Sequence, residues 1–353
     1  MAATSGIFGP MQGSDQAYLA IQAETKVGRM AGMELPDFGQ LPPGIKLPPE
    51  ALMFSGKPTR VLNVRLWSPS IAPKDAKATL APPPGLKQGD KLDLDLYRPE
   101  GADTGKVQGV DPDSNPNFTI KIYWGSSQTV KEGQPKVITW STLSPEYKAA
   151  MKNQARAANA AGSYFYKEGW TTGYWPTKKQ PGSIDLAASL VGKYSLTTTY
   201  TGNVDIEAPS NVNFLDAYAL SSPNLDKEVD LSKFIPLKWA AIPNVLGQNA
   251  TIFGMEGKNT MIIWSSSETY TEALMGDTGF MQMADVRENV TKNIFMAPDR
   301  TSADVPVGIF KNADMAFLNL TGYGPGSALE KAQPLPRIQT KTNLMVMLGG
   351  KGM

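Results

Sequence analysis

Cysteine and histidine are both absent from this chain of 353 residues. The lack of cysteine excludes disulfides, thiolate metal sites and cysteine nucleophiles. The lack of histidine excludes a Ser-His-Asp triad, a histidine zinc site and an imidazole general base. Catalysis would have to use carboxylate pairs, lysine, tyrosine, or a serine with a lysine base. The two absences favour a binding or structural protein over an enzyme, and a lack of cysteine is common among exported bacterial surface proteins.

A strong net charge and long apolar runs are missing as well. The formal net charge is +1, which gives no reason to expect nucleic acid or an anionic membrane as a partner. The longest apolar runs, residues 261–264 and 344–348, are too short to span a bilayer. Residues 1–14 lack the basic start and apolar core of a signal peptide. We expect either a cytoplasmic protein or the mature form of an exported one.

Three short patterns occur twice, in the same order and roughly 140 to 160 residues apart. Ala-x-Pro-x-x-Leu-x-Gln stands at residues 81–88 and 241–248. Trp-x-Ser-Ser-x-Thr stands at residues 124–129 and 264–269, and Leu-x-Ser-Pro begins at Leu66 and at Leu220. Such self-similarity predicts one β-rich unit used twice.

Short runs of alternating apolar and polar residues predict an all-β fold. In residues 61–67, for example, Leu62, Val64 and Leu66 alternate with polar or larger side chains. Frequent Gly, Pro, Asn and Asp between such runs are typical of antiparallel sandwiches. We predict two tandem immunoglobulin-like antiparallel sandwiches, at residues 58–143 and 186–353.

Residues 1–57 are predicted to form an N-terminal arm, helical at first and then proline-rich. Ser14 can cap a short helix within residues 14–33. Five prolines follow between Pro36 and Pro49, and repeated proline favours an extended chain that cannot sit inside a sheet. Two interpretations remain open: a flexible linker, or an ordered arm that lies in a groove of a neighbouring subunit.

Residues 144–185 are predicted to join the two sandwiches. Ser144 and Pro145 mark a helix start, and Gly162 is placed to end that helix. A dense aromatic cluster follows, which can be either a small core that seals the junction or an exposed platform for sugar rings. The candidate ligand-binding residues of the platform are Tyr164, Tyr166, Trp170, Tyr174 and Trp175.

One segment has the alternating oxygen ligands of a calcium loop. The candidate metal ligands are Asp111, Asp113, Asn115 and Asn117. The segment departs from the EF-hand pattern, because Pro116 stands where glycine is required and Ile122 where the closing glutamate belongs. A turn rich in proline and asparagine explains the residues equally well. No cofactor is predicted.

The serines of the repeated tryptophan pattern are the natural candidates for a nucleophile in a chain without histidine. These are Ser126, Ser127, Ser265, Ser266 and Ser267. Neither copy contains Ser-x-x-Lys, and neither forms a Gly-x-Ser-x-Gly elbow. We therefore expect these hydroxyls to cap a strand end and a tight turn.

Two local resemblances add to these predictions. Leu237, Trp239 and Pro243 form a Leu-x-Trp-x-x-x-Pro pattern that resembles the second strand of fibronectin type III domains. In that family the tryptophan fills the centre of the sandwich, which implies an immunoglobulin-like core here. The paired tryptophan patterns, with YWGSSQTV and MIIWSSSE, resemble uncharacterised exported proteins of alphaproteobacteria. That resemblance implies an envelope or extracellular setting and no particular activity.

The sequence thus favours a non-catalytic structural or adhesive protein of the cell envelope that assembles with itself. The arm and an edge strand at residues 344–348 would supply the contacts, by β-augmentation. Removing residues 1–57 would then leave a folded monomer. One alternative is a carbohydrate-binding protein, with polysaccharide as its partner. A second is a carboxylate-based glycoside hydrolase or lyase, for which no pair of carboxylates stands out.

Overall fold

The computed structural model describes residues 16–33, 54–98, 118–142, 169–180, 182–271 and 281–350. This part of the chain is mostly β, with α3 (Met283–Thr291) as its one α-helix and two short 3-10 turns, η2 (Pro84–Leu86) and η4 (Trp140–Thr142). The proline-rich stretch, the helix predicted before Gly162 and the calcium-like loop lie outside the described residues. In the described residues no helix has the length and apolar character to cross a membrane.

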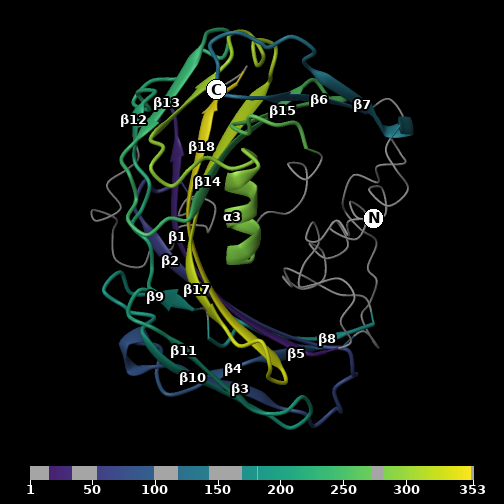
Figure 1. The fold of residues 1–353 in the computed structure, drawn as a ribbon, viewed down its shortest axis with the longest axis vertical. Helices are drawn as coiled ribbons and strands as arrows, with labels where there is room; N and C mark the ends of the chain where they lie inside the picture. The colour runs from purple at the N-terminus through teal and green to yellow at the C-terminus, as the bar shows by residue number, and fades with distance from the viewer. Residues whose placement is uncertain are drawn as a thin grey trace.

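An eleven-stranded sheet forms the centre of the molecule and curves around α3 (Figure 1). Its order is β5 (Asp95–Tyr97), β8 (Thr171–Trp175), β2 (Thr59–Ser68), β1 (Tyr18–Met30), β18 (Leu335–Gly349), β17 (Met315–Ala328), β14 (Gly247–Glu256), β15 (Thr260–Ser265), β6 (Thr119–Trp124) and β7 (Lys136–Thr139). The short strand β9 (Ser183–Ile184) pairs with β2 off this path.

Two smaller sheets pack against the large one and enclose two apolar cores. The four-stranded sheet has the order β11 (Val204–Ala208), β10 (Gly192–Thr198), β3 (Ala78–Ala81) and β4 (Leu92–Asp93). The three-stranded sheet has the order β12 (Leu220–Ser222), β13 (Ile235–Trp239) and β16 (Ser302–Val305). The first core contains Leu62, Val64 and Tyr194, and the second contains Trp239 and Trp264. Each core is therefore sandwich-like, but both rest on one shared sheet rather than in two separate domains.

The predicted N-terminal helix is instead the strand β1. Alternate side chains Leu19, Ile21 and Ala23 fill the first core, while Gln22 and Glu24 are buried on the other face. Strand β1 pairs antiparallel with β2 and parallel with β18. Ala and Gln have good helix propensity, but pairing on both sides overrides that local preference. Residues 18–30 are thus the middle of the sheet, and removing residues 1–57 would take out a central strand.

The predicted edge strand at residues 344–348 is also central. These residues belong to β18, which pairs with β1 on one side and with β17 on the other. Leu344, Val346 and Leu348 are fully buried in the second core. The run is apolar because it packs inside the protein, so it offers no free edge to a partner.

The strands β6 and β7 lie beside strands of the second predicted repeat. Strand β6 runs parallel to β15, with Tyr123 opposite Trp264 and Trp124 opposite Ser265. Residues 118–142, predicted to belong to the first sandwich, therefore pair with a strand of the predicted second sandwich. This pairing brings the two copies of the tryptophan-serine pattern side by side.

Candidate functional site

The ends of the parallel strands β6 and β15 are joined directly. The Gly125 N–H donates to the carbonyl of Ser265 at 3.0 Å, and the indole N–H of Trp264 donates to the carbonyl of Gly125 at 3.1 Å. The register is offset by one residue, so the two tryptophans lie on opposite faces. Trp264 is buried in the second core, whereas Trp124 contacts Tyr270, with 5.0 Å between ring centroids.

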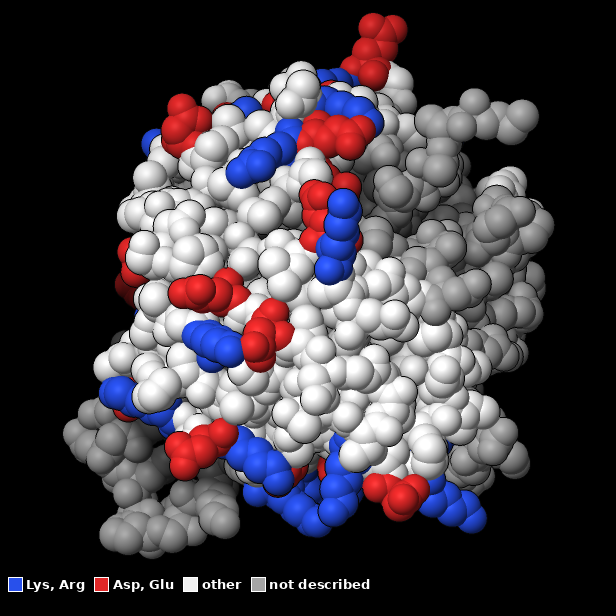
Figure 2. All heavy atoms as spheres, turned by 60° about the horizontal axis from the view of Figure 1, so that its bottom comes forward, with Lys and Arg blue, Asp and Glu red and all other residues white. Residues whose placement is uncertain are grey.

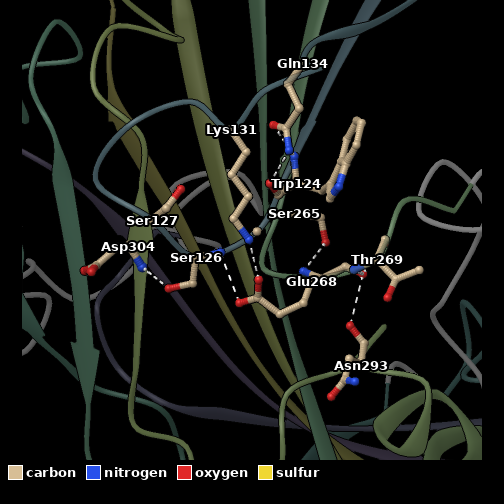
Figure 3. Close-up of polar contacts among 12 residues, drawn as sticks. Trp124, Ser126, Ser127, Lys131, Gln134, Ser265, Glu268, Thr269, Asn293 and Asp304 are labelled. Atoms are coloured by element: carbon tan, nitrogen blue, oxygen red, sulfur yellow. Dashed lines mark hydrogen bonds and ion pairs between the residues drawn. The ribbon is translucent and has the colours of Figure 1, made fainter.

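The first serine pair holds the backbone of one residue in another sheet (Figure 3). The amide N–H of Asp304 donates to Ser126 Oγ at 2.8 Å, and the N–H of Ser127 donates to the Asp304 carbonyl at 3.1 Å. Asp304 lies on β16, at the edge of the three-stranded sheet. We call this two-bond arrangement a serine clasp. It occupies backbone groups that an edge strand would otherwise leave unpaired.

The second copy forms a similar two-bond clasp with β14, but through Ser266 alone rather than through a serine pair. The N–H of Ala250 donates to Ser266 Oγ at 3.0 Å, and the N–H of Ser266 donates to the Ala250 carbonyl at 2.8 Å. The turns that follow also match, because Ser127 Oγ donates to the Thr129 carbonyl and Ser267 Oγ to the Thr269 carbonyl, at 2.7 and 2.6 Å. The prediction that these hydroxyls cap strand ends and tight turns is confirmed.

Glu268 connects the two serine clasps. Its carboxylate accepts the Ser126 N–H at 3.3 Å and pairs with Lys131 Nζ at 2.6 Å (Figure 3). Arg300 Nη1 lies 3.9 Å from the same carboxylate. Gly125 makes room for this pair, because a Cβ at its position would lie 2.5 Å from Lys131 Nζ. The side chains of Lys131 and Glu268 are 42% and 37% exposed. Solvent screens an ion pair of this kind, so it adds little to the stability of the fold.

The arrangement at these strand ends holds segments together rather than preparing a nucleophile. Ser265 Oγ donates to Asn249 Oδ1 at 3.3 Å and accepts the Ser267 N–H at 3.2 Å. The other serine hydroxyls of the motif form the bonds given above. Lys131, which could have served as a base, binds the carboxylate of Glu268 instead. A serine activated by lysine needs a hydrogen bond between the two groups, and these contacts do not supply it.

The two tryptophans of the aromatic platform predicted for sugar rings are both buried. Trp170 is 9% exposed and stacks on Tyr18, with 6.4 Å between ring centroids. Trp175 is 1% exposed, and its indole N–H donates to Gln180 Oε1 at 3.1 Å. The alternation of β8 in the large sheet explains the burial of Trp175, which enters the first core. Neither ring can therefore present a face to a polysaccharide.

Of the three tyrosines of the predicted platform, only Tyr174 lies within the described residues. Tyr174 is half-buried beside Arg65, whose guanidinium lies 5.9 Å from the Tyr174 ring centre. Burial lowers the pKa of Arg65 to about 10, an effect that Tyr174 partly opposes. Arg65 also donates to the carbonyls of Val64 and Trp175, both at 2.8 Å. Tyr164 and Tyr166 lie outside the described residues, so a sugar-binding role for them stays a prediction.

The candidate metal ligands Asp111, Asp113, Asn115 and Asn117 all lie outside the described residues. Within the described ranges, acidic side chains form no group of three or more that could hold a metal ion. Asp93 and Asp95 are exposed, and they alternate with the buried Leu92 and Leu94. Asp93 pairs with Lys91 at 2.9 Å.

The structure also contains a buried glutamine network that no sequence pattern indicates. Gln248 is 1% exposed, and its Oε1 accepts from the Tyr218 hydroxyl at 2.7 Å and from the Trp239 indole at 3.1 Å. Its Nε2 donates to the carbonyls of Ala297, Pro298 and Arg300. In the sequence Gln248 stands out only as the last residue of the repeated Ala-x-Pro-x-x-Leu-x-Gln pattern. Its counterpart Gln88 is partly exposed, so the pattern alone does not identify the network.

Comparison with known proteins gives no match to a family model and no match to a characterised protein.

Proposed function

We propose that this protein is a non-catalytic structural protein of the cell envelope or cell exterior that assembles with further copies of itself. The observation that carries the proposal is the edge strand β7, whose Val137 side chain is 52% exposed. In the described part of the chain, β7 pairs with β6 alone. An edge strand with an exposed apolar side chain is a template for strand addition.

The serine clasps support the non-catalytic part of the proposal. The groups that could have done chemistry are the motif serines, Lys131 and Glu268. They bind backbone groups, the Asn249 side chain or one another. One clasp occupies the backbone of β16, which lies at a sheet edge. A role in holding strand ends accounts for all of these contacts.

The other sheet edges are more strongly protected than β7, which is four residues long and carries one exposed lysine, Lys136. Strand β11 carries the exposed Asp205 and Glu207, and Asp205 pairs with Lys193 at 2.6 Å. The view of the four-stranded sheet shows acidic and basic side chains interspersed (Figure 2). Strands β4, β5 and β12 are two or three residues long. Charge and shortness are the usual protections of an edge, so β7 is the edge best suited to receive a second copy.

We infer further that the second core is immunoglobulin-like. Trp239 of the Leu-x-Trp-x-x-x-Pro pattern is 4% exposed and belongs to that core, as the resemblance to fibronectin type III domains implies. A rigid β core of this kind suits a load-bearing or adhesive subunit. The absence of cysteine, common among exported bacterial proteins, supports the external setting.

The test is the mass of the purified protein by light scattering, with negative-stain images of the same sample. We expect a mass that is a multiple of 38.1 kDa and rises with protein concentration. A monomer of 38.1 kDa at every concentration would contradict self-assembly.

A further inference from the structure

Strands β1 and β18 bring a lysine and an asparagine directly opposite each other. The two strands run parallel, with Lys26 opposite Asn343 and Glu24 opposite Lys341. Neighbouring strands lie about 4.7–4.9 Å apart, and side chains two residues apart share a face of the sheet. These four side chains therefore form one group on a single face, and the lysine chain is long enough to reach the asparagine amide.

Glu24 lies at the centre of this group. Its carboxylate oxygens lie 3.2 Å from Lys26 Nζ and 3.4 Å from Lys341 Nζ, and its side chain is only 7% exposed. A buried carboxylate needs a cation to offset its loss of hydration. Lys341, itself 16% exposed, already meets that need. The carboxylate thus has a second lysine, Lys26, within reach as a proton donor.

Asn343 is oriented by the strand on its other side. Its Nδ2 donates to Thr321 Oγ1 of β17 at 2.9 Å, and Thr321 is its direct partner in that strand pair. The amide nitrogen therefore faces β17, and Lys26 lies on the opposite, β1 side of Asn343. The Lys26 side chain is 47% exposed, so a small leaving group has a route to solvent.

We propose that Lys26 and Asn343 form an intramolecular amide cross-link. Glu24 takes a proton from the Lys26 ammonium, and the resulting amine attacks Cγ of Asn343. A bond forms between Lys26 Nζ and Asn343 Cγ, and a second proton passes from Nζ to Nδ2. The bond between Cγ and Nδ2 breaks, ammonia departs, and Glu24 returns its proton to that ammonia. Atoms and charge balance without an oxidant, a reductant or any other co-reactant.

The fold supplies the conditions that this reaction needs. Fixed cross-strand partners give a high effective concentration of amine at the amide carbon. The product ties β1 to β18 and closes a loop of more than 300 residues between them. In a chain without cysteine, such a bond would restrict the unfolded state as a disulfide does. The proposal is independent of self-assembly, since it concerns bonds within one molecule.

Intact-mass spectrometry of the purified full-length protein tests the proposal, followed by proteolysis and peptide mapping. We expect a mass lower than that of the sequence by one ammonia, and a branched peptide that contains both Lys26 and Asn343. Lys26→Arg and Asn343→Ala should each show their full sequence mass, and so should Glu24→Gln. Lys341→Arg is the matched control, because it keeps a cation beside Glu24 and should still lose ammonia.

Circular dichroism of each variant shows whether it is folded, and Lys26→Arg is the least disruptive of them. A wild-type mass equal to that of the sequence after prolonged incubation overturns the proposal. An ammonia loss that persists in Lys26→Arg overturns it too, because it points to an asparagine that cyclises onto its own backbone.

Discussion

The indole N–H of Trp239 donates to Oε1 of Gln248, 3.1 Å away, at the centre of the second core. The same oxygen accepts the Tyr218 hydroxyl, so one buried amide joins β13, β14 and the segment before β12. Gln248→Ala would leave these donors and three backbone carbonyls without their partner. Such a loss should lower the free energy of unfolding by about 2–4 kcal/mol, because buried polar groups would be left unsatisfied. Urea denaturation measures the change.

Gln88 provides the matched control for Gln248, since it occupies the same place in the repeated pattern but is partly exposed. Gln88→Ala should change the free energy of unfolding by less than about 1 kcal/mol. Equal costs at the two positions would contradict the importance given to the buried network.

The two serine clasps should differ in strength because their surroundings differ. Ser266→Ala leaves the buried N–H of Ala250 unpaired, at an expected cost of about 1–3 kcal/mol. Ser126→Ala frees the N–H of Asp304, which is only partly buried and can bind water, so its cost should be about 1 kcal/mol or less. Thermal unfolding of the two variants, followed by circular dichroism, compares them. A larger loss for Ser126→Ala would contradict the assignment.

Strand β1 should be essential to the fold rather than a removable arm. Ile21 is fully buried in the first core, so Ile21→Ala should cost about 2–5 kcal/mol. Val191→Ala is the control, because Val191 is 37% exposed and its truncation should cost less than about 0.5 kcal/mol. Denaturant unfolding gives both values. An Ile21→Ala variant as stable as the wild type would contradict the claim that packing of β1 in the first core is essential to the fold.

Trp175 should contribute to stability and not to sugar binding. Trp175→Ala would remove a large side chain from the first core, at an expected cost of about 3–5 kcal/mol. Tryptophan fluorescence of the wild type on addition of soluble polysaccharides should show no change that depends on Trp175. A saturable response that is lost in a folded Trp175→Ala variant would restore the platform hypothesis.

Local patterns predicted the strands better than they predicted the sheet. The alternation of residues 61–67 placed Leu62, Val64 and Leu66 inward, and all three are fully buried. Residues 14–33 are predicted to contain a helix, whereas residues 18–30 form strand β1. Both faces of β1 are buried over residues 18–25, so this strand lacks the exposed polar face that marks a half-buried strand in a sequence. The parallel pairing of β6 with β15, and of β1 with β18, depends on contacts between distant segments. Local periodicity carries no information about such pairings.

In the candidate site, too, the local turns could be predicted from the sequence, whereas the contacts between distant segments could not. The repeated Trp-x-Ser-Ser-x-Thr pattern identified the turns that Ser127 and Ser267 form. It could not show that the two copies lie side by side, or that Glu268 binds Lys131 between them. The sequence could not predict the burial of Trp170 and Trp175 either, since the same aromatic residues occur both in protein cores and on binding surfaces.

The most direct test of the proposed function compares two lysine substitutions by light scattering. Val137 on the edge strand β7 and Leu186 in the loop between β9 and β10 are 52% and 53% exposed. Val137→Lys should leave a folded monomer of 38.1 kDa, because a charge on the edge opposes strand addition. Leu186→Lys should assemble as the wild type does. If Val137→Lys assembles unchanged, β7 is not the contact and the account of self-assembly is wrong.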